Sequence, residues 1–244
     1  MGKTKYSLNL NFFGIGVGVE FEEERLFLEM RERWFESQIK KEDLRVEIKG
    51  LGRKHEIVSG EVKKETSDFK EGEIKPDFSY EDYVDWLVKV VLQERLIDKK
   101  VLFLHASGVI NKEGKVVAVV GKSGAGKSTF VSNFSRERVI GDDVVVVKIR
   151  DEGLRVTRVW EKHKSGVGFI GEVELEEIDC LSWGERLEFQ EGKKREVFRE
   201  LMASVYWSGN KVIDYTRMSL KLLRLVEVRC LRVPPKFKSE QFLF

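Results

Sequence analysis

The sequence predicts an α/β fold in which a small β-rich region, residues 1–75, precedes a larger α/β region, residues 76–244. Three observations lead to this prediction. Residues 6–12 alternate between polar and apolar side chains, as a half-buried strand does. Two later segments repeat apolar side chains at helical spacing. A continuous apolar run, Val116–Val120, has the character of a strand buried on both faces.

The composition excludes several classes of protein. The 244 residues are 41% hydrophobic and 11% aromatic, enough to form a core without disulfide bonds. Lys and Arg total 44 against 42 Asp and Glu, and the net charge of +2 argues against a nucleic-acid partner held by bulk charge. No apolar run reaches the roughly 18 residues that a membrane span needs, so we expect no membrane partner.

Two further features bear on the environment of the protein. Cys180 and Cys230 stand far apart in the sequence, without a metal-binding spacing, so we expect reduced, buried thiols and a cytoplasmic location. The chain is rich in Lys and Glu and poor in Asn and Gln, a bias typical of the surface ion-pair networks of thermophile proteins.

The β-rich region begins with a hairpin-like pair of strands. Three glycines, Gly14, Gly16 and Gly18, follow the first strand. Their spacing is not a dinucleotide-binding fingerprint, because no helical pattern follows and the flanking residues resemble strands. We expect further strands at Leu26–Met30, Leu44–Ile48 and His55–Val62, and a polar loop over 63–75.

The α/β region opens with a helix that starts near Ser79, where Asp82 completes a variant of the capping box. Its apolar face carries Tyr83, Trp86, Leu87, Val90 and Val91. Beyond it we expect strands at Val101–His105 and Ala106–Ile110, short strands within 153–190, helices over Arg195–Tyr206 and within Asn210–Leu223, and a last strand at Val226–Val233.

The apolar strand Val116–Val120 leads directly into Gly121–Thr129, which matches the P-loop pattern G-x-x-x-x-G-K-S, and helix-compatible residues follow as far as Arg138. Glycines at these positions let successive backbone N–H groups turn toward a phosphate chain. Lys127 is expected to reach the β- and γ-phosphates, Ser128 to bind Mg²⁺, and Thr129 to cap or touch the α-phosphate. The residues predicted to bind a nucleoside triphosphate are Gly121, Ser123, Gly124, Ala125, Gly126, Lys127, Ser128 and Thr129.

Two adjacent acids, Asp142 and Asp143, precede the apolar run Val144–Val147. Carboxylates beside a buried strand are costly unless a cation faces them, and a nucleotide-bound Mg²⁺ provides one. Two acids also allow two roles, since one can hold Mg²⁺ while the other accepts a proton from an acceptor hydroxyl.

A histidine, His105, ends the strand Val101–His105, within the segment LHASGV. A single histidine is more often structural than catalytic, and its sequence context is what makes it a candidate. Three segments then stand in order: LHASGV, VAVVGKSGAGKST and VIGDDVVVV.

This order and spacing resembles the catalytic domain of the HPr serine kinase/phosphorylase family and its smaller relatives, which share a P-loop core with the phosphoenolpyruvate carboxykinases. The resemblance implies that Gly121–Thr129 bind ATP, that Asp142 and Asp143 share Mg²⁺ binding and base duty, and that His105 lies near the phosphates. It also implies a multimer. The family's second signature is replaced by Lys164–Ile170, which keeps the glycine spacing but lacks the acid, so the resemblance is to the short, kinase-like members.

The sequence therefore predicts an ATP- and Mg²⁺-dependent phosphotransferase in which Asp142, Asp143, Lys127 and His105 act on the γ-phosphoryl group and a hydroxyl acceptor. The acceptor is a protein serine or a small molecule. Two alternatives stay open: an ATP-binding switch or adaptor without catalysis, and a simple ATPase. Leu181–Glu185 faintly resembles the signature of ABC-type ATPases, but that class is disfavoured because Arg186–Phe198 is charged and contains no apolar strand ending in Asp-Glu. A GTPase is disfavoured because the chain has no Asn-Lys-x-Asp motif.

Overall fold

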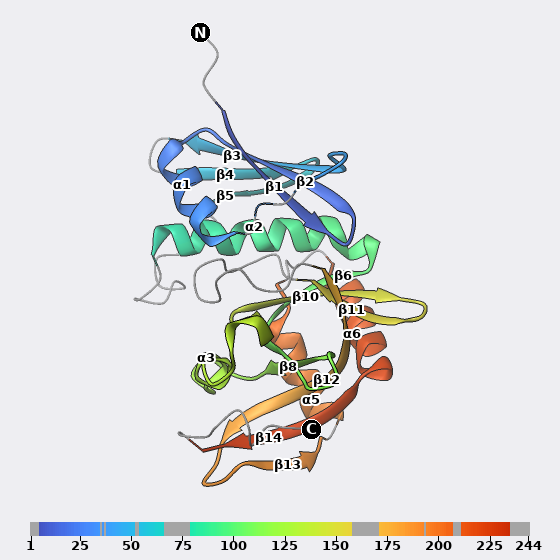
Figure 1. Cartoon of the computed structure of the whole chain (residues 1–244). Coiled ribbons are helices and arrows are strands. Elements are labelled where there is room, and N and C mark those ends of the chain that lie inside the picture. Colours follow the sequence, from blue (N-terminus) through green and yellow to red (C-terminus); the bar gives the residue numbers. More distant parts are fainter. Residues whose placement is uncertain are drawn as a thin grey trace. The chain divides into compact units, whose positions relative to one another are not determined.

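The computed structural model describes residues 5–34, 36, 38–51, 54–65, 79–157, 171–192, 194–206 and 211–234. The fold is mixed α/β and divides into two compact units, unit 1 (Met1–Leu96) and unit 2 (Ile97–Phe244), which Figure 1 shows in blue to green and in green to red. The expected division at 75/76 lies earlier than this boundary. Helix α2 (Tyr80–Leu96) belongs to unit 1 because it packs on two strands of that unit, β4 and β5.

Unit 1 is a five-stranded sheet, in the order β1-β2-β3-β4-β5, that packs against two helices. Strands β2 and β3 are parallel, and the other neighbours are antiparallel. The elements that precede α2 are β1 (Tyr6–Phe12), β2 (Ile15–Phe21), α1 (Glu24–Arg33), β3 (Leu44–Leu51), β4 (Lys54–Ser59) and β5 (Val62–Glu65).

The predicted strand Leu26–Met30 is wrong, because these residues lie within helix α1. Leu26 and Met30 are four residues apart, so a helix brings both side chains to the buried face. A short apolar run does not distinguish a strand from a helix by periodicity alone. The expected strand Leu44–Ile48 lies within β3, whereas the expected strand His55–Val62 is divided by a turn at Gly60 into β4 and the start of β5.

The start of α2 confirms the predicted capping box. The backbone N–H of Asp82 donates to Ser79 Oγ at 3.1 Å, and the N–H of Ser79 donates to Asp82 Oδ2 at 2.9 Å. Four of the five residues predicted for its apolar face are buried, and Trp86 is half-buried.

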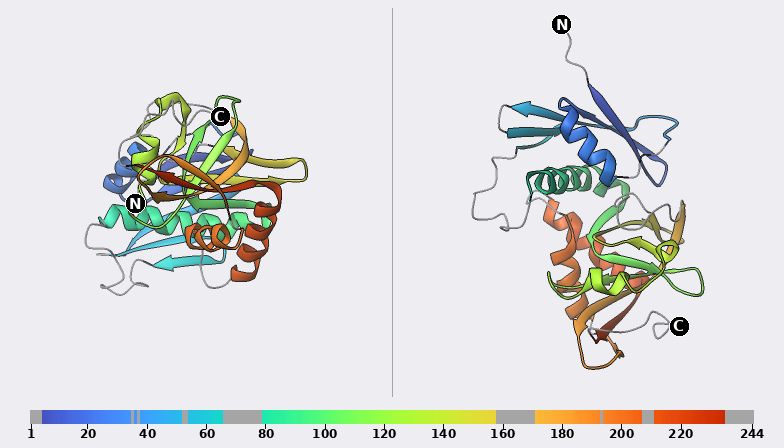
Figure 2. Two further views of the ribbon diagram at one scale, coloured as in Figure 1. Left: turned by 90° about the horizontal axis from the view of Figure 1, so that it is seen from below. Right: turned by 60° about the vertical axis from the view of Figure 1, so that its left-hand side comes forward.

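Unit 2 is built on a nine-stranded sheet whose main path runs β6-β10-β11-β12-β8-β7-β9, with β14 beside β12 and β13 beside β14. Figure 2 shows how this sheet curls around α5 and α6. The elements are η1 (Ile97–Lys99), β6 (Val101–His105), β7 (Ser107–Ile110), β8 (Val116–Val120), α3 (Lys127–Val131), η2 (Arg136–Arg138), β9 (Val139–Gly141), β10 (Val144–Arg150), β11 (Gly153–Thr157), β12 (Glu172–Trp183), β13 (Glu188–Glu191), α5 (Lys194–Ser204), α6 (Val212–Leu225) and β14 (Glu227–Val233).

Strand β8 is buried on both faces, as its continuous apolar sequence predicts. Val116, Ala118 and Val120 belong to a core cluster that includes side chains of α5 and α6. Val117 and Val119 face the opposite cluster, which contains Phe130 and Val131 of α3. Gly121, which follows β8, is therefore held at the end of a strand that is packed on both faces.

Two expectations for unit 2 need correction. The helix expected to continue to Arg138 ends at Val131, because Ser132 Oγ and Asn133 Nδ2 both donate to the Thr129 carbonyl, at 2.8 and 2.7 Å, and compete with helical hydrogen bonding. The short strands expected within 153–190 are present as β11 and β13, but the strand between them, β12, is long and spans 12 residues. The glycine-spaced segment Lys164–Ile170 lies outside the described residues.

Candidate functional site

The strand registers of unit 2 bring the three sequence motifs to one edge of the sheet. Ser107, at the start of β7, pairs with Val119 near the end of β8. On its other side β7 pairs Gly108 with Gly141, the last residue of β9. The segment after β8, the residue before β7 and the segment after β9 therefore meet at the same edge.

The first motif forms a glycine-rich loop at this edge. Gly124 and Gly126 have φ angles of 80° and 94°, in the left-handed region that glycine adopts without strain. The N–H of Ala125 donates to the Lys122 carbonyl at 3.0 Å and closes a turn inside the loop. The backbone path of residues 121–126 thus depends on glycine at two positions.

Lys127 directs its ammonium group back into this loop. Its Nζ donates to the Gly121 carbonyl at 2.9 Å and to the Lys122 carbonyl at 3.4 Å, and the residue is buried. The ammonium group is therefore held inside the loop by two of the loop's own carbonyl oxygens.

The helix after the loop is short. Helix α3 has five residues, and its N-cap, Gly126, has no side chain to cap it. Ser128 and Thr129 in its first turn are exposed, so their hydroxyl and amide groups face solvent. Because so short a helix has a weak dipole, an anion at this loop would be held mainly by the loop amides and Lys127.

The two aspartates differ in their surroundings. The Asp142 carbonyl accepts a hydrogen bond from Ser107 Oγ at 2.5 Å, and the Asp143 carbonyl accepts one from the Ala106 N–H at 3.1 Å. Both backbone positions are therefore fixed to the segment that follows β6. Asp142 is only 7% exposed, whereas the Asp143 side chain is 46% exposed. Asp143 is therefore the more accessible of the two carboxylates.

The side chains of His105 and Asp143 lie side by side. His105 Nε2 is 3.6 Å from Asp143 Oδ1, because Val144, the first residue of β10, pairs with His105 in the sheet. Tyr206 completes the cluster: its hydroxyl donates to Asp143 Oδ2 at 3.4 Å, and its ring stacks on the imidazole with centroids 6.3 Å apart.

No local sequence pattern marks Tyr206 as a neighbour of His105, because the two residues lie about a hundred positions apart in the chain. Its place is set by backbone pairing. Val205, just after α5, bridges to Leu104, and the Tyr206 N–H donates to the Phe103 carbonyl at 3.3 Å. Ser107 lies within the LHASGV segment, but the sequence does not show that its hydroxyl donates to the Asp142 carbonyl. That contact follows from the pairing of β7 with β9.

A divalent cation at this edge would depend on oxygen ligands from a bound phosphate. Within the described ranges, no three His, Cys, Asp or Glu side chains gather closely enough to form a metal site. Mg²⁺ typically takes one or two carboxylates, keeps several waters and completes its shell with substrate phosphates. The predicted set of Ser128, Asp142 and Asp143 has the chemistry that such an ion requires.

A second ionisable cluster, on β12 and β14, is buried in the sheet. The Arg229 guanidinium contacts Glu177 and lies 3.3 Å from Asp179 Oδ1. Burial raises the pKa of Asp179 to about 8. The neighbouring Cys180 thiol has a pKa raised by burial to about 12, which makes it a poor nucleophile.

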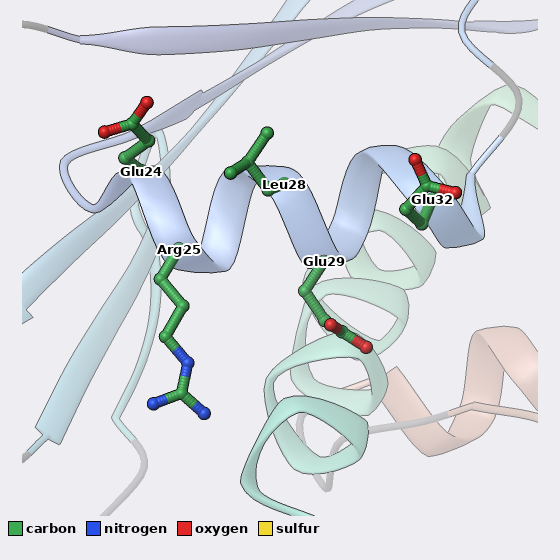
Figure 3. Close-up of a pocket in the computed structure, with 5 residues that line it drawn as sticks. All are labelled: Glu24, Arg25, Leu28, Glu29 and Glu32. Carbon is green, nitrogen blue, oxygen red and sulfur yellow. The ribbon is translucent and has the colours of Figure 1, made fainter.

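A shallow depression on the exposed face of α1 is a weak candidate for a ligand-binding site. Figure 3 shows that its lining side chains fan out around the helix and do not converge on a common point; they are Glu24, Arg25, Leu28, Glu29 and Glu32. Arg25 and Glu29 are engaged in surface ion pairs, with Glu81 and Arg33. Such a surface lacks the enclosed, convergent groups of a small-molecule site.

Across the described part of the chain, no helix is both long and apolar enough to traverse a bilayer. Comparison of the sequence with protein-family models and with curated proteins gave no match.

Proposed function

We propose that the protein is an ATP- and Mg²⁺-dependent phosphotransferase of the HPr-kinase-like type, acting on a hydroxyl group in the cytoplasm. One observation carries the proposal: a glycine loop with an inward-pointing lysine and a reachable carboxylate held by a histidine and a tyrosine stand at the same sheet edge. Phosphoryl transfer needs an anion cradle and a proton acceptor near each other.

The backbone amides of the loop and the Lys127 ammonium group bind and orient the triphosphate, and Lys127 neutralises charge that builds up on the transferred group. Ser128 and Asp142 hold Mg²⁺, which supplies charge neutralisation at the β- and γ-phosphates when bound. Asp142 suits this role because its backbone is anchored to Ser107 and its side chain is shielded from bulk water.

Asp143 accepts the proton of the acceptor hydroxyl. It is the more exposed aspartate, and the Tyr206 hydroxyl hydrogen-bonds to Oδ2, which orients the carboxylate. His105, beside Oδ1, lies where it can polarise the transferred group or the acceptor. The acceptor is a protein serine or a small hydroxyl compound. We propose neither a nucleic-acid nor a membrane partner; the multimer implied by the family resemblance stays a prediction.

The test is a thermal-shift and turnover assay with ATP·Mg²⁺, alone and with lysate of the same organism. Wild-type protein is expected to be stabilised by ATP and to label a lysate component. Lys127→Ala is expected to lose the stabilisation. Lys122→Ala, which removes an exposed lysine from the same loop, is the matched control and is expected to keep it.

The two aspartates are tested in the same assay. Asp143→Asn is expected to bind ATP and lose transfer, and Asp142→Asn to weaken the dependence on Mg²⁺. Normal transfer by both variants contradicts the mechanism. ATP binding with neither transfer nor hydrolysis in the wild type, abolished in Lys127→Ala, identifies a nucleotide-dependent switch instead. Hydrolysis without a labelled acceptor identifies an ATPase.

A further inference from the structure

Trp183, the last residue of β12, lies against the glycine-rich loop. Its indole Nε1–H donates to the Gly124 carbonyl at 3.1 Å. A Cβ on Gly126 would lie 2.5 Å from Cζ2 of the same ring and 2.8 Å from Cη2. The indole therefore contacts the loop at two of its glycines, and Gly126 leaves the space that the ring occupies.

The position of this side chain follows from the sheet. Strand β12 runs parallel to β8, with Cys180 opposite Val120, so the residues after Cys180 extend along the same edge as the glycine loop. Trp183 is nevertheless 45% exposed. A large aromatic side chain left exposed beside a polar, anion-attracting loop needs an explanation beyond core packing.

The hydrogen bond fixes the orientation of the ring. The indole N–H bond lies in the ring plane, so a bond from Nε1 to Gly124 directs one edge of the indole at the loop. An added Cβ on Gly126 would lie 2.5 Å from Cζ2, 2.8 Å from Cη2 and 3.1 Å from Cε2, which places it over a π face of the six-membered ring and not beyond its edge. One face of the indole therefore covers Gly126, and stacking by a ligand would use the opposite face.

We propose that Trp183 is the stacking platform for the base of the nucleotide whose phosphates occupy the glycine loop. The inference rests on the proposed function. A planar ring already held by a hydrogen bond to Gly124 and by contact of one face with Gly126 loses little conformational entropy when a base stacks on its opposite face. Stacking accepts every base because each has a π face, and purines offer the larger area. The ligand class is a purine nucleoside triphosphate, with little discrimination between adenine and guanine by Trp183 itself.

The test separates the base from the phosphates. Binding of ATP·Mg²⁺ and of inorganic tripolyphosphate·Mg²⁺ is measured by calorimetry for wild type, Trp183→Phe and Trp183→Leu. Leucine keeps apolar bulk but has no π face, and phenylalanine keeps a π face but has no donor for Gly124. Trp183→Leu is expected to weaken ATP about tenfold and to leave tripolyphosphate unchanged. Trp183→Phe is expected to retain most of the ATP affinity.

Fluorescence gives an independent readout. The difference between wild-type and Trp183→Phe emission reports this indole among the five tryptophans, and we expect ATP, but not tripolyphosphate, to quench it. Equal losses of ATP and tripolyphosphate affinity in Trp183→Leu would show that the ring only braces the loop, and unchanged affinities would show that it does not contact the base. Either result overturns the inference and leaves the proposed function standing. A wild-type protein that binds neither ligand overturns both.

Discussion

Gly126 shows how closely a single residue is constrained at this site. Its φ of 94° strains any residue with a side chain, and a Cβ would collide with the Trp183 ring. Gly124, two residues earlier, shares the first constraint with a φ of 80° but has no heavy atom within 4 Å of an added Cβ. A substitution at Gly124 therefore introduces backbone strain alone, whereas a substitution at Gly126 introduces both backbone strain and a steric clash.

We predict that Gly126→Ala lowers the free energy of unfolding by about 2 kcal/mol or more, and Gly124→Ala by only about 1 kcal/mol. The difference reflects the displaced indole, so Gly126→Ala is also expected to shift the tryptophan emission, and Gly124→Ala is not. Urea unfolding followed by fluorescence measures both quantities. Equal destabilisation by the two variants would contradict the contact with Trp183.

Tyr206→Phe removes the hydroxyl that donates to Asp143 and keeps the ring that stacks on His105. We predict a fall of about fivefold in kcat for phosphoryl transfer with ATP affinity unchanged, since a hydrogen bond to a charged group contributes about 1 kcal/mol or more. Tyr206→Leu, which also removes the stacked ring, is expected to lose more. Steady-state kinetics with the identified acceptor check this, and a rise in KM for ATP alone would argue against an orienting role.

For single residues, the sequence predicts the features that depend only on neighbouring positions in the chain. The glycine loop, Lys127 and the paired aspartates are recognisable because their chemistry depends on neighbours in the chain. Tyr206 and Trp183 are brought to this edge of the sheet by strand pairing between distant segments. Neither the hydrophobic periodicity nor the motif spacing of the sequence indicates such pairing.

Helix α2 begins with an arrangement in which capping and charge act together. Besides its reciprocal bonds with Ser79, Asp82 accepts a hydrogen bond from Arg33 of α1 at 2.5 Å. Burial opposes ionisation of Asp82, but the bonds from Arg33 and Ser79 outweigh it, so the pKa of Asp82 is lowered from its ordinary value of 3.8.

A lowered pKa in the folded state means that the stabilisation is present above the unfolded pKa, near pH 4, and is lost as the pH falls through the folded value. Asp82→Ala is expected to destabilise unit 1 by about 1 kcal/mol at pH 7 and by progressively less below pH 4. Circular dichroism during urea unfolding, at pH 7 and pH 3, measures the difference. Glu81→Ala, which removes a surface ion pair one residue away, is the control with a smaller expected effect.

Elements with a strong local signal are the ones that sequence reasoning located. The capping residues and apolar face of α2, and the continuous burial of β8, are properties of contiguous residues. Helix α1 was assigned to a strand because a five-residue apolar segment fits either period. The true extent of β12 depends on its partners, since it pairs with β11 at one end and with β8 and β14 at the other.

At the scale of the whole molecule, the division into two units assigns α2 to the β-rich part of the chain. The helix packs on β4 and β5, and the Trp34 indole donates to Asp85 of α2 at 2.6 Å. The core clusters that surround β8 consist of residues after Leu96. A helical pattern in the sequence predicts α2 but not which sheet it covers, which is why 75/76 was expected.

We predict that a fragment of residues 97–244 folds cooperatively and keeps the ATP affinity of the full chain. A fragment of residues 76–244 carries α2 without the strands on which it packs and is expected to expose apolar surface and self-associate. Sedimentation, urea unfolding and calorimetry with ATP·Mg²⁺ distinguish the two. If only the longer fragment is folded and monomeric, the earlier boundary is the right one.

The pairing of β8 with β12 joins segments that are far apart in the sequence, and this separation affects the order in which parts of the molecule fold. Val117 pairs with Glu177, sixty positions later, whereas β1 and β2 are joined by a turn of two residues, Phe13 and Gly14. Contacts distant in sequence form slowly, because chain closure costs entropy before the contact compensates for it. After dilution from denaturant, the β1–β2 hairpin should therefore form early, and the glycine loop should gain its neighbour Trp183 among the last events. A newly made chain would form its first hairpin well before the glycine loop and Trp183 come together.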